Sequence, residues 1–378
     1  MPKVESHSAE GSAGADLALV ALVGKRDEPT DALRDYCAWL GEALGRRGAT
    51  METVEVLWDR QGWFGALARL WKQSGEWRGR WVVLQYTALM WSRRGFPLAV
   101  PAILWMMKMR GCRTAVVFHD VYAIPDGRWI DRVRVKFQVL VMRHARRWAD
   151  RAIFPVPVEQ VPWLSSAAPN AAFIPVGANI PSRDDLEQLG PLPEHSLPLA
   201  VAVFGISECA WAQDQEIEHI AQVMRETSAA VGELRLSVFG RGAKEAEPAL
   251  REAVRGCRVH LTVDGLLSGT DVSARLSASD VLLFVRGPLS SRRGSGLAGI
   301  ACGLPVVAYE GRETGFPLRD AGVLFASQND VPALCELLSR VLRDEELRRA
   351  LASRSTAVFR EWFSWDRIAE RLIEVLGA

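Results

Sequence analysis

No stretch of this sequence is apolar for long enough to cross a membrane. The most apolar region, residues 96–109, contains Pro97 and Pro101 and is shorter than the roughly 20 residues that a membrane-spanning helix needs. The first 15 residues are polar, rich in Ser and Gly, and lack the apolar core of a secretory signal peptide. This composition predicts a disordered tail on a cytoplasmic protein.

Paired cysteines and an excess of one charge are also missing. The six cysteines stand singly, without a CxxC motif or a Cys/His cluster, which argues against a zinc site and against a disulfide framework. The net charge of +1 gives no overall field that would favour nucleic acid. We therefore expect reduced, buried thiols, no metal and no nucleic-acid partner.

Short apolar runs alternate with helix-length segments along the whole chain. This alternation is typical of βαβ units, which build a parallel sheet. Strands are expected at 17–23, 51–57, 81–86, 113–118, 151–154, 171–174, 200–204, 234–239, 259–263, 281–284 and 306–308. Helices are expected at 31–47, 96–110, 129–148, 215–231, 243–255, 271–277, 331–343, 345–359 and 365–376.

A change of composition divides the chain in two. Residues 175–199 hold five prolines with several acidic residues and little apolar periodicity, which is a linker composition. The predicted organisation is a tail at 1–15, a first domain at 16–180, a linker at 181–198, a second domain at 199–362, and a C-terminal helix at 363–378 expected to pack back on the first domain. Two doubly wound α/β domains of this kind would face a central cleft at the carboxyl ends of their strands.

The most informative segment is a basic, glycine-rich loop that leads into a short helix of small residues. The loop consists of Ser290, Ser291, Arg292, Arg293, Gly294, Ser295 and Gly296. Such a loop lets backbone N–H groups approach an anion, and a helix N-terminus directs about half a positive charge at it. The two arginines add permanent cations. The segment therefore suits a diphosphate, and a solvated surface loop is the alternative.

The order of motifs resembles that of GT-B-fold glycosyltransferases of family 4, the group 1 glycosyl transferases. The matching segments are IPVGANI at 174–180, SVFGRG at 237–242, VDGL at 263–266, LSASDVLL at 276–283, GIACGLPVVA at 299–308 and FSW at 363–365, with HD at 119–120 as a looser match. The resemblance implies two Rossmann-like domains and retaining transfer of a sugar, without a metal, from a UDP- or GDP-linked nucleotide-sugar. It also implies that the donor binds the second domain and that a glycan or lipid-linked acceptor binds the first.

Two donor-site features of that family are missing here. The family's Glu-x7-Glu pair corresponds to Ser290 and Ala298, so both carboxylates are absent, and residues 204–215 lack the expected arginine and lysine. We hypothesise that Arg292 and Arg293, with the amides of 294–296, neutralise the diphosphate instead. The missing carboxylates leave two alternatives open: a weak or inactive homologue that serves as a binding or scaffold partner of an active glycosyltransferase, and a nucleotide-sugar epimerase.

The resemblance suggests further site residues. On the donor side these are Gly205, Gly240, Arg241, Lys244, Leu266 and Glu313, and on the acceptor side Gly24 and Lys25. His119 follows a buried strand and is predicted to hydrogen-bond the donor sugar or to orient an acceptor hydroxyl. Asp120 is a second catalytic candidate. A histidine satisfied by local backbone and an aspartate that caps a helix are the alternatives.

Tryptophan is concentrated in the first half of the chain. Eleven of the fourteen tryptophans lie between Trp39 and Trp163, and many arginines accompany them. Tryptophan together with Arg or Lys suits the interface of an anionic membrane, and residues 90–108 are the best candidate for it. The resulting hypothesis is peripheral docking on the inner face of the cell membrane. Buried core tryptophans are the alternative, because Trp is highly buried on average.

Overall fold

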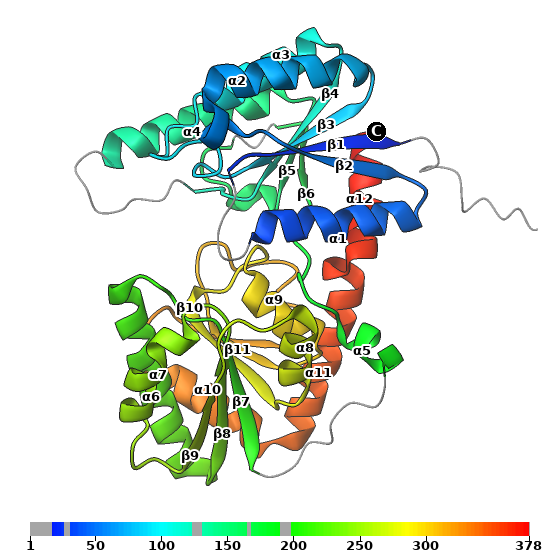
Figure 1. Cartoon of the computed structure of the whole chain (residues 1–378). Coiled ribbons are helices and arrows are strands. Elements are labelled where there is room, and N and C mark those ends of the chain that lie inside the picture. The colour runs from blue at the N-terminus through cyan, green and yellow to red at the C-terminus, as the bar shows by residue number, and fades with distance from the viewer. Residues whose placement is uncertain (1–16, 26–30, 123–130, 165–167, 190–197, 378) are drawn as a thin grey trace, which may run out of the picture. The chain divides into compact units, whose positions relative to one another are not determined.

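The protein contains two parallel sheets in two compact units (Figure 1). The computed structural model describes residues 17–25, 31–122, 131–164, 168–189 and 198–377. One unit comprises Met1–Ile174 with Ile368–Ala378, and the other comprises Pro175–Arg367. The expected tail at 1–15, the expected turn at 27–30, the first two residues of the helix expected at 129–148 and much of the expected linker, 190–197, lie outside the described residues.

The first unit holds a six-stranded sheet with the order β2-β1-β3-β4-β5-β6, in which all neighbouring pairs are parallel. The strands are β1 (Ala18–Val23), β2 (Thr50–Glu55), β3 (Trp81–Tyr86), β4 (Arg113–Phe118), β5 (Arg151–Phe154) and β6 (Ala171–Phe173). All six residues of β3 are buried, as expected of a strand covered on both faces. Each of these strands overlaps one expected from the sequence.

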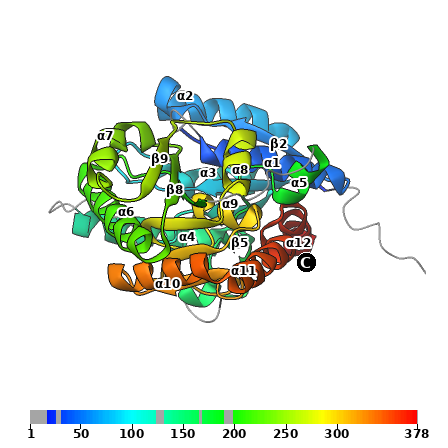
Figure 2. The same ribbon diagram turned by 90° about the horizontal axis from the view of Figure 1, so that it is seen from below.

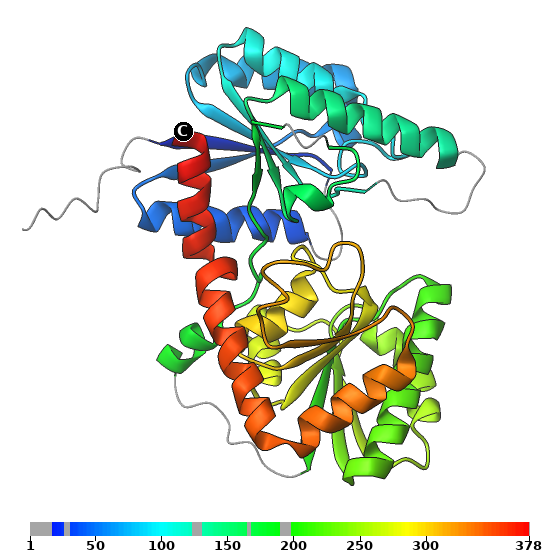
Figure 3. The ribbon, with the colours of Figure 1, turned by 180° about the vertical axis from the view of Figure 1, so that it is seen from behind.

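Helices cover both faces of this sheet. On one face lies α1 (Ala32–Arg46), and on the other lie α2 (Trp58–Gln73), α3 (Ala99–Met109) and α4 (Asp131–Trp148) (Figures 1 and 3). Short 3-10 turns occur at η1 (Ser74–Glu76) and η2 (Val158–Gln160). From Ile368 onward, α12 (Trp365–Gly377) also belongs to this unit.

Two of these helices differ from the sequence prediction. The helix expected at 96–110 begins at Ala99, because Phe96 precedes Pro97 and is thereby disfavoured in the helical conformation. The helix α2 was not predicted. Gly62 interrupts it with φ 71° and ψ 163°, so its apolar residues do not follow one helical stripe. None of the described helices is both long enough and apolar enough to cross a membrane.

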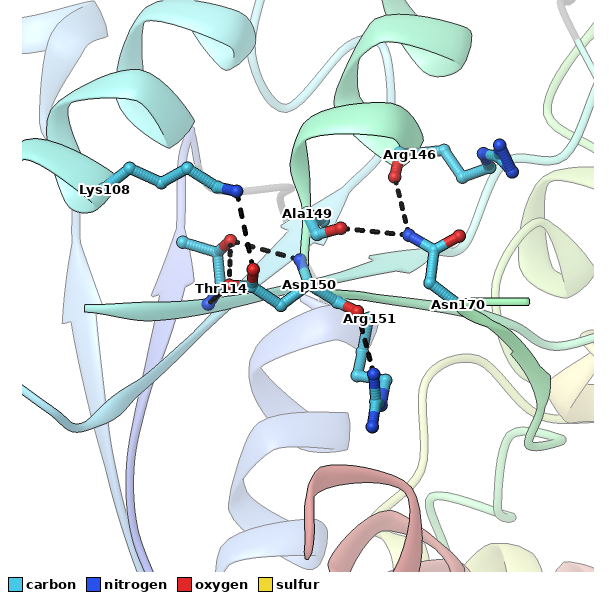
Figure 4. Close-up of polar contacts among 7 residues, drawn as sticks. All are labelled: Lys108, Thr114, Arg146, Ala149, Asp150, Arg151 and Asn170. Carbon is cyan, nitrogen blue, oxygen red and sulfur yellow. Dashed lines mark hydrogen bonds and ion pairs between the residues drawn. The ribbon is translucent and has the colours of Figure 1, made fainter. Parts of the chain in front are cut away.

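A polar network joins α3, β4, α4 and β5 at the amino end of the first sheet (Figure 4). Asp150 Oδ2 accepts hydrogen bonds from the Thr114 amide at 2.7 Å and from the Thr114 hydroxyl at 3.0 Å, and Lys108 Nζ lies 3.4 Å from Asp150 Oδ1. Asn170 Nδ2 donates to the carbonyls of Arg146 and Ala149, each at 3.0 Å. Partial burial raises the pKa of Asp150, but the hydrogen bonds from Thr114 and the charge and hydrogen bond of Lys108 together outweigh this effect, and the pKa is lowered overall.

The second unit repeats the doubly wound plan with the order β12-β11-β10-β7-β8-β9. Its strands are β7 (Leu199–Phe204), β8 (Leu234–Phe239), β9 (Val259–Val263), β10 (Val281–Pro288), β11 (Val306–Tyr309) and β12 (Val323–Ala326). Its helices are α5 (Arg183–Leu189), α6 (Ala210–Val231), α7 (Ala243–Ala253), α8 (Gly269–Ser277), α9 (Gly294–Ala301), α10 (Val331–Arg343), α11 (Glu345–Val358) and the π-turn η3 (Phe359–Phe363). The strand β12 was not expected, and α5 lies in the segment interpreted as a linker.

Each face of the second sheet has its own apolar core. The helices α6, α7 and α10 pack on one face around Val201, Leu236 and Leu338, and α8, α9 and α11 pack on the other around Leu282, Leu297 and Val358 (Figure 2). The carboxyl ends of the parallel strands, and the loops that follow them, lie together at one edge of this sheet. Those ends are the usual place for a ligand in an open parallel sheet.

Candidate functional site

The candidate site lies where the second sheet changes direction. The chain runs from β7 outward to β8 and β9, and then returns to β10 on the other side of β7. The loops that follow β7 and β10 therefore diverge, and a crevice at this switch point is the characteristic ligand site of such sheets. Gly205 follows β7, and Arg286 lies near the carboxyl end of β10.

Gly205 allows the guanidinium of Arg286 to lie directly against the backbone. The residue has φ +79°, and its amide donates to the Phe239 carbonyl at 2.7 Å. A Cβ at this position would lie 2.9 Å from Arg286 Nη1. The sequence did not single out Arg286, because one arginine after an apolar strand looks like an ordinary surface residue.

The basic loop and α9 follow on from β10, as the sequence predicted. Ser290 and Ser291 are buried, and the Arg293 amide donates to the Ser290 carbonyl at 3.0 Å. The helix starts at Gly294, and no side chain caps its N-terminus. An uncapped N-terminus leaves backbone N–H donors and a partial positive charge available to an anion.

Arg292 and Glu313, both candidates from the sequence, form a salt bridge with each other. Arg292 Nε donates to Glu313 Oε2 at 2.7 Å, and Arg292 Nη2 donates to Oε1 at 3.0 Å. Such a bidentate pair neutralises most of the charge of this arginine. The free positive charge of the loop therefore resides mainly on its neighbour.

Arg293 is partly buried beside other cations. Burial lowers the pKa of Arg293 below its ordinary value; Arg292 and Arg286 add to this effect, whereas Glu313 and Glu216 oppose it. Within the described part of the chain, three buried atoms of this region have no hydrogen-bond partner: Arg286 Nε, Ser290 Oγ and Arg293 Nε. Buried polar groups are nearly always paired, so these atoms mark a place for a ligand that accepts hydrogen bonds.

Glu216 is a second residue that the sequence did not single out. It is 5% exposed on α6, and its carboxylate accepts hydrogen bonds from the amide and the hydroxyl of Ser207. It thereby holds the loop after β7 and lies near Arg293. A glutamate within an amphipathic helix gives no sequence signal for such a role.

The loop after β8 adjoins the loop after β7. Gly240 has φ +95°, and a Cβ there would lie 2.9 Å from the Phe204 ring. The Arg241 carbonyl accepts a hydrogen bond from the Ile206 amide at 2.9 Å. By contrast, Lys244 pairs with Glu247 on its own helix at 2.9 Å, and Leu266 is 53% exposed. The structure thus brings Gly240 and Arg241 beside Gly205, and it gives Lys244 and Leu266 no comparable contact.

The carboxyl edge of the first sheet holds the remaining candidates. His119 follows β4 and is almost completely buried; its Nε2 shares a 2.7 Å hydrogen bond with Gln85 Oε1, and its ring meets that of Tyr36 edge-on. Asp120 accepts a hydrogen bond from the Ala88 amide at 3.3 Å. Among the described residues, Gln85 Nε2 and Tyr86 Oη are buried without a partner. Gln85 and Tyr86 were not predicted as site residues.

Gly24 and Lys25 lie at the end of β1 and are fixed by the loop that follows β3. The Lys25 amide donates to the Met90 carbonyl at 3.0 Å, and a Cβ on Gly24 would lie 2.5 Å from that carbonyl oxygen. The turn is therefore packed against backbone, and a glycine is required there. No group of three or more His, Cys, Asp or Glu side chains suited to a metal ion occurs among the residues that the structure describes.

Comparison with solved structures identifies the fold. HepE of Anabaena, solved in complex with UDP and glucose, has a TM-score of 0.62 at 14% identity, covering 95% of this chain and 99% of HepE. The sucrose-phosphate synthase of Thermosynechococcus elongatus has a TM-score of 0.65 at 18% identity, and the match covers 95% of this chain and 98% of the synthase. A protein of Listeria monocytogenes described as a putative UDP-N-acetylglucosamine 2-epimerase has a TM-score of 0.58 at 12% identity, and the match covers 95% of each chain.

These similarities show that the chain has the GT-B fold, with two Rossmann-like domains, as the sequence predicted. Solved structures that are similar to this chain include a glycosyltransferase from Rickettsia africae and WaaG, a glycosyltransferase of lipopolysaccharide biosynthesis, besides the protein described as an epimerase. No protein-family model matches the sequence, and no curated protein matches it.

Proposed function

We propose that the protein is a glycosyltransferase that moves a sugar, with retention, from a UDP- or GDP-linked donor to a glycan or lipid-linked acceptor. The observation that carries this proposal is the group of buried, unpartnered donors at the switch point of the second sheet, next to the uncapped start of α9. Hydrogen-bond donors and positive charge at this position suit a diphosphate. The binding of UDP by the structurally similar HepE supports the same choice of ligand.

In this proposal the arginines stabilise the departing nucleoside diphosphate. Negative charge grows on the phosphate as the bond to the sugar breaks, and preorganised cations stabilise that charge without further reorganisation. Arg286 and Arg293 would contact the phosphates, and Glu216 and Glu313 would hold the surrounding loops. His119, oriented by Gln85, would serve the sugar or the acceptor on the first domain.

A titration with UDP and with GDP tests the donor site. We expect Arg286→Ala and Arg293→Ala each to weaken binding by about ten-fold or more, because a hydrogen bond to a charged group contributes roughly 1.5–3 kcal/mol. Arg349→Ala, which removes an exposed arginine of α11, is the matched control and should leave affinity unchanged. Unchanged affinity for both nucleotides in both site variants would refute the proposal.

One observation favours a second function, a non-catalytic binding partner. Ala298, which stands at the position of a family carboxylate, is 1% exposed and belongs to the apolar core around α9. No acidic group reaches the donor from that position. A transfer and donor-hydrolysis assay separates the two functions: nucleotide binding without turnover on any acceptor would favour the binding partner. Nuclear magnetic resonance of the product would distinguish transfer from epimerisation.

A further inference from the structure

Large hydrophobic side chains are exposed mainly on one part of the first unit. Of the twelve exposed large hydrophobic residues in the described part of the chain, nine fall between residues 64 and 148. They are Phe64, Trp71, Leu89, Leu98, Trp105, Met109, Val133, Leu140 and Trp148. Most of them belong to α2, α3 and α4, which cover the same face of the sheet (Figures 1 and 3). Clustered exposure of this kind marks an interaction surface.

The same three helices and their connections are strongly cationic. Their exposed basic residues are Arg60, Arg69, Lys72, Arg93, Arg94, Lys108, Arg132, Lys136, Arg143 and Arg147. Asp59 is the one acidic side chain that the structure describes within these helices, and in the connection that follows α2 the exposed Glu76 is accompanied by the exposed Arg78. Since the whole chain has a net charge of only +1, this positive charge is a local property of the surface.

A hollow of about 520 Å³ opens on this surface between α2, the loop at 91–96 and the start of α3. Its walls are Trp58, Trp63, Leu67, Trp91, Ser92, Arg93, Arg94, Phe96, Leu98 and Ala99. The break in α2 at Gly62 forms one wall, because it lets Trp63 stack on Trp58 with ring centroids 5.0 Å apart. The volume is within the range of roughly 300–1,000 Å³ that accommodates small ligands.

The indole N–H groups of Trp58 and Trp91, two tryptophans that line the hollow, both donate hydrogen bonds to backbone carbonyls. Trp58 Nε1 donates to the Met90 carbonyl at 2.9 Å, and Trp91 Nε1 donates to the Gln85 carbonyl at 2.8 Å. Ring surface, rather than N–H donors, therefore faces the hollow. An apolar hollow with Arg93 and Arg94 among its walls suits a hydrocarbon chain beneath an anionic headgroup.

We propose that the surface formed by α2, α3, α4 and residues 91–98 binds an anionic phospholipid membrane, with part of one lipid chain in the hollow. Exposed aromatic and aliphatic side chains enter the interface while arginines and lysines meet the headgroups. A second copy of this chain is a poor occupant, because like charges would meet across the contact. Nucleic acid accounts for the cations but not for Phe64, which is 95% exposed, or Trp105.

Vesicle flotation with the full-length chain tests this surface. Binding is expected to vesicles of phosphatidylcholine mixed with phosphatidylglycerol, to weaken with added salt, and to be slight with phosphatidylcholine alone. Phe64→Ser with Leu98→Ser, and separately Arg69→Glu with Lys72→Glu, should each reduce binding by about ten-fold or more. These side chains are exposed, so the melting temperature should stay unchanged.

Trp211→Ser is the matched control, since Trp211 is 73% exposed in the second unit, outside this surface. It should bind vesicles as the wild type does. The proposal would be overturned if the wild type bound neither kind of vesicle, or if both double variants bound as well as the wild type. An equal loss of binding in Trp211→Ser would overturn it as well. Binding of a generic oligonucleotide that depends on Arg69 and Lys72, without vesicle binding, would assign the surface to nucleic acid instead.

Discussion

At the scale of single residues, the partly buried arginines of the second unit are the most informative feature. A guanidinium removed from water without full pairing destabilises the folded state. Arg293 is in this situation, because its Nε is buried without a partner and Arg286 and Arg292 lie close to it. Strain of this kind tends to persist at functional sites, where a ligand relieves it. This supports a ligand role for Arg293 more strongly than the arginine count in the sequence does.

His219 gives a prediction of pH dependence. Burial on α6 lowers the pKa of His219, and the carboxylates of Glu218 and Glu216 oppose this only in part; Nδ1 lies 3.1 Å from the Tyr309 hydroxyl. As the pH falls through about 6.5, the unfolded chain binds a proton at this histidine that the folded chain resists. The free energy of unfolding should therefore decrease from about pH 7.5 to about pH 5.5.

Urea denaturation across that pH range measures the effect. In His219→Gln the side chain cannot titrate, so the decrease should be smaller than in the wild type. Identical pH profiles of wild type and variant would show that His219 is not the group responsible.

At the scale of elements, the position of α9 depends on close contact with β10. A Cβ on Gly299 would lie 2.5 Å from Leu282 Cδ2 and 3.2 Å from Leu282 Cβ, and Leu282 is fully buried. Gly299→Ala should therefore destabilise the protein by about 1–3 kcal/mol, as overpacking does. It should also weaken nucleotide binding, because the start of α9 must shift.

Gly294→Ala is the control for this prediction. Nothing lies within 4 Å of a Cβ at Gly294, which is the first residue of the same helix. Its free energy of unfolding in urea should equal or slightly exceed that of the wild type, since Ala favours the helix. Equal stability of Gly299→Ala and Gly294→Ala would contradict the packing argument.

Most elements could be predicted from the sequence, because buried parallel strands form continuous apolar runs that Gly, Asp or Pro residues interrupt. The helix α2 could not, since Gly62 breaks it and its exposed face carries Phe64 and Trp71 in place of polar residues. The basic loop and α9 were predictable from residues local in sequence. Arg286 and Glu216 were not, because their role depends on strand order, which brings β10 beside β7.

At the scale of the whole molecule, the last helix belongs to two parts of the chain. Trp365 Nε1 donates to the Ala178 carbonyl at 2.8 Å within the second unit, whereas residues from Ile368 onward belong to the first. There, Ile368, Leu372 and Leu376 are buried, Arg151 Nε donates to the Val375 carbonyl at 2.8 Å, and Glu370 pairs with Arg47 at 3.8 Å. The first unit is therefore completed by a segment remote in sequence.

Deletion of residues 368–378 should destabilise the first unit and spare nucleotide binding. Each buried aliphatic side chain contributes about 1.5–3 kcal/mol, so the loss of three removes much of the roughly 5–15 kcal/mol that stabilises a typical domain. Tryptophan fluorescence in urea reports mainly on the first unit, which holds eleven of the fourteen tryptophans. The urea midpoint of unfolding should fall sharply, while the affinity for UDP, which we expect to bind the second unit, should change little.

Glu370→Ala is the control for this deletion, because it removes only one partly exposed ion pair and should lower the urea midpoint only slightly. An unchanged midpoint after the deletion would mean that the helix does not contribute to the core of the first unit.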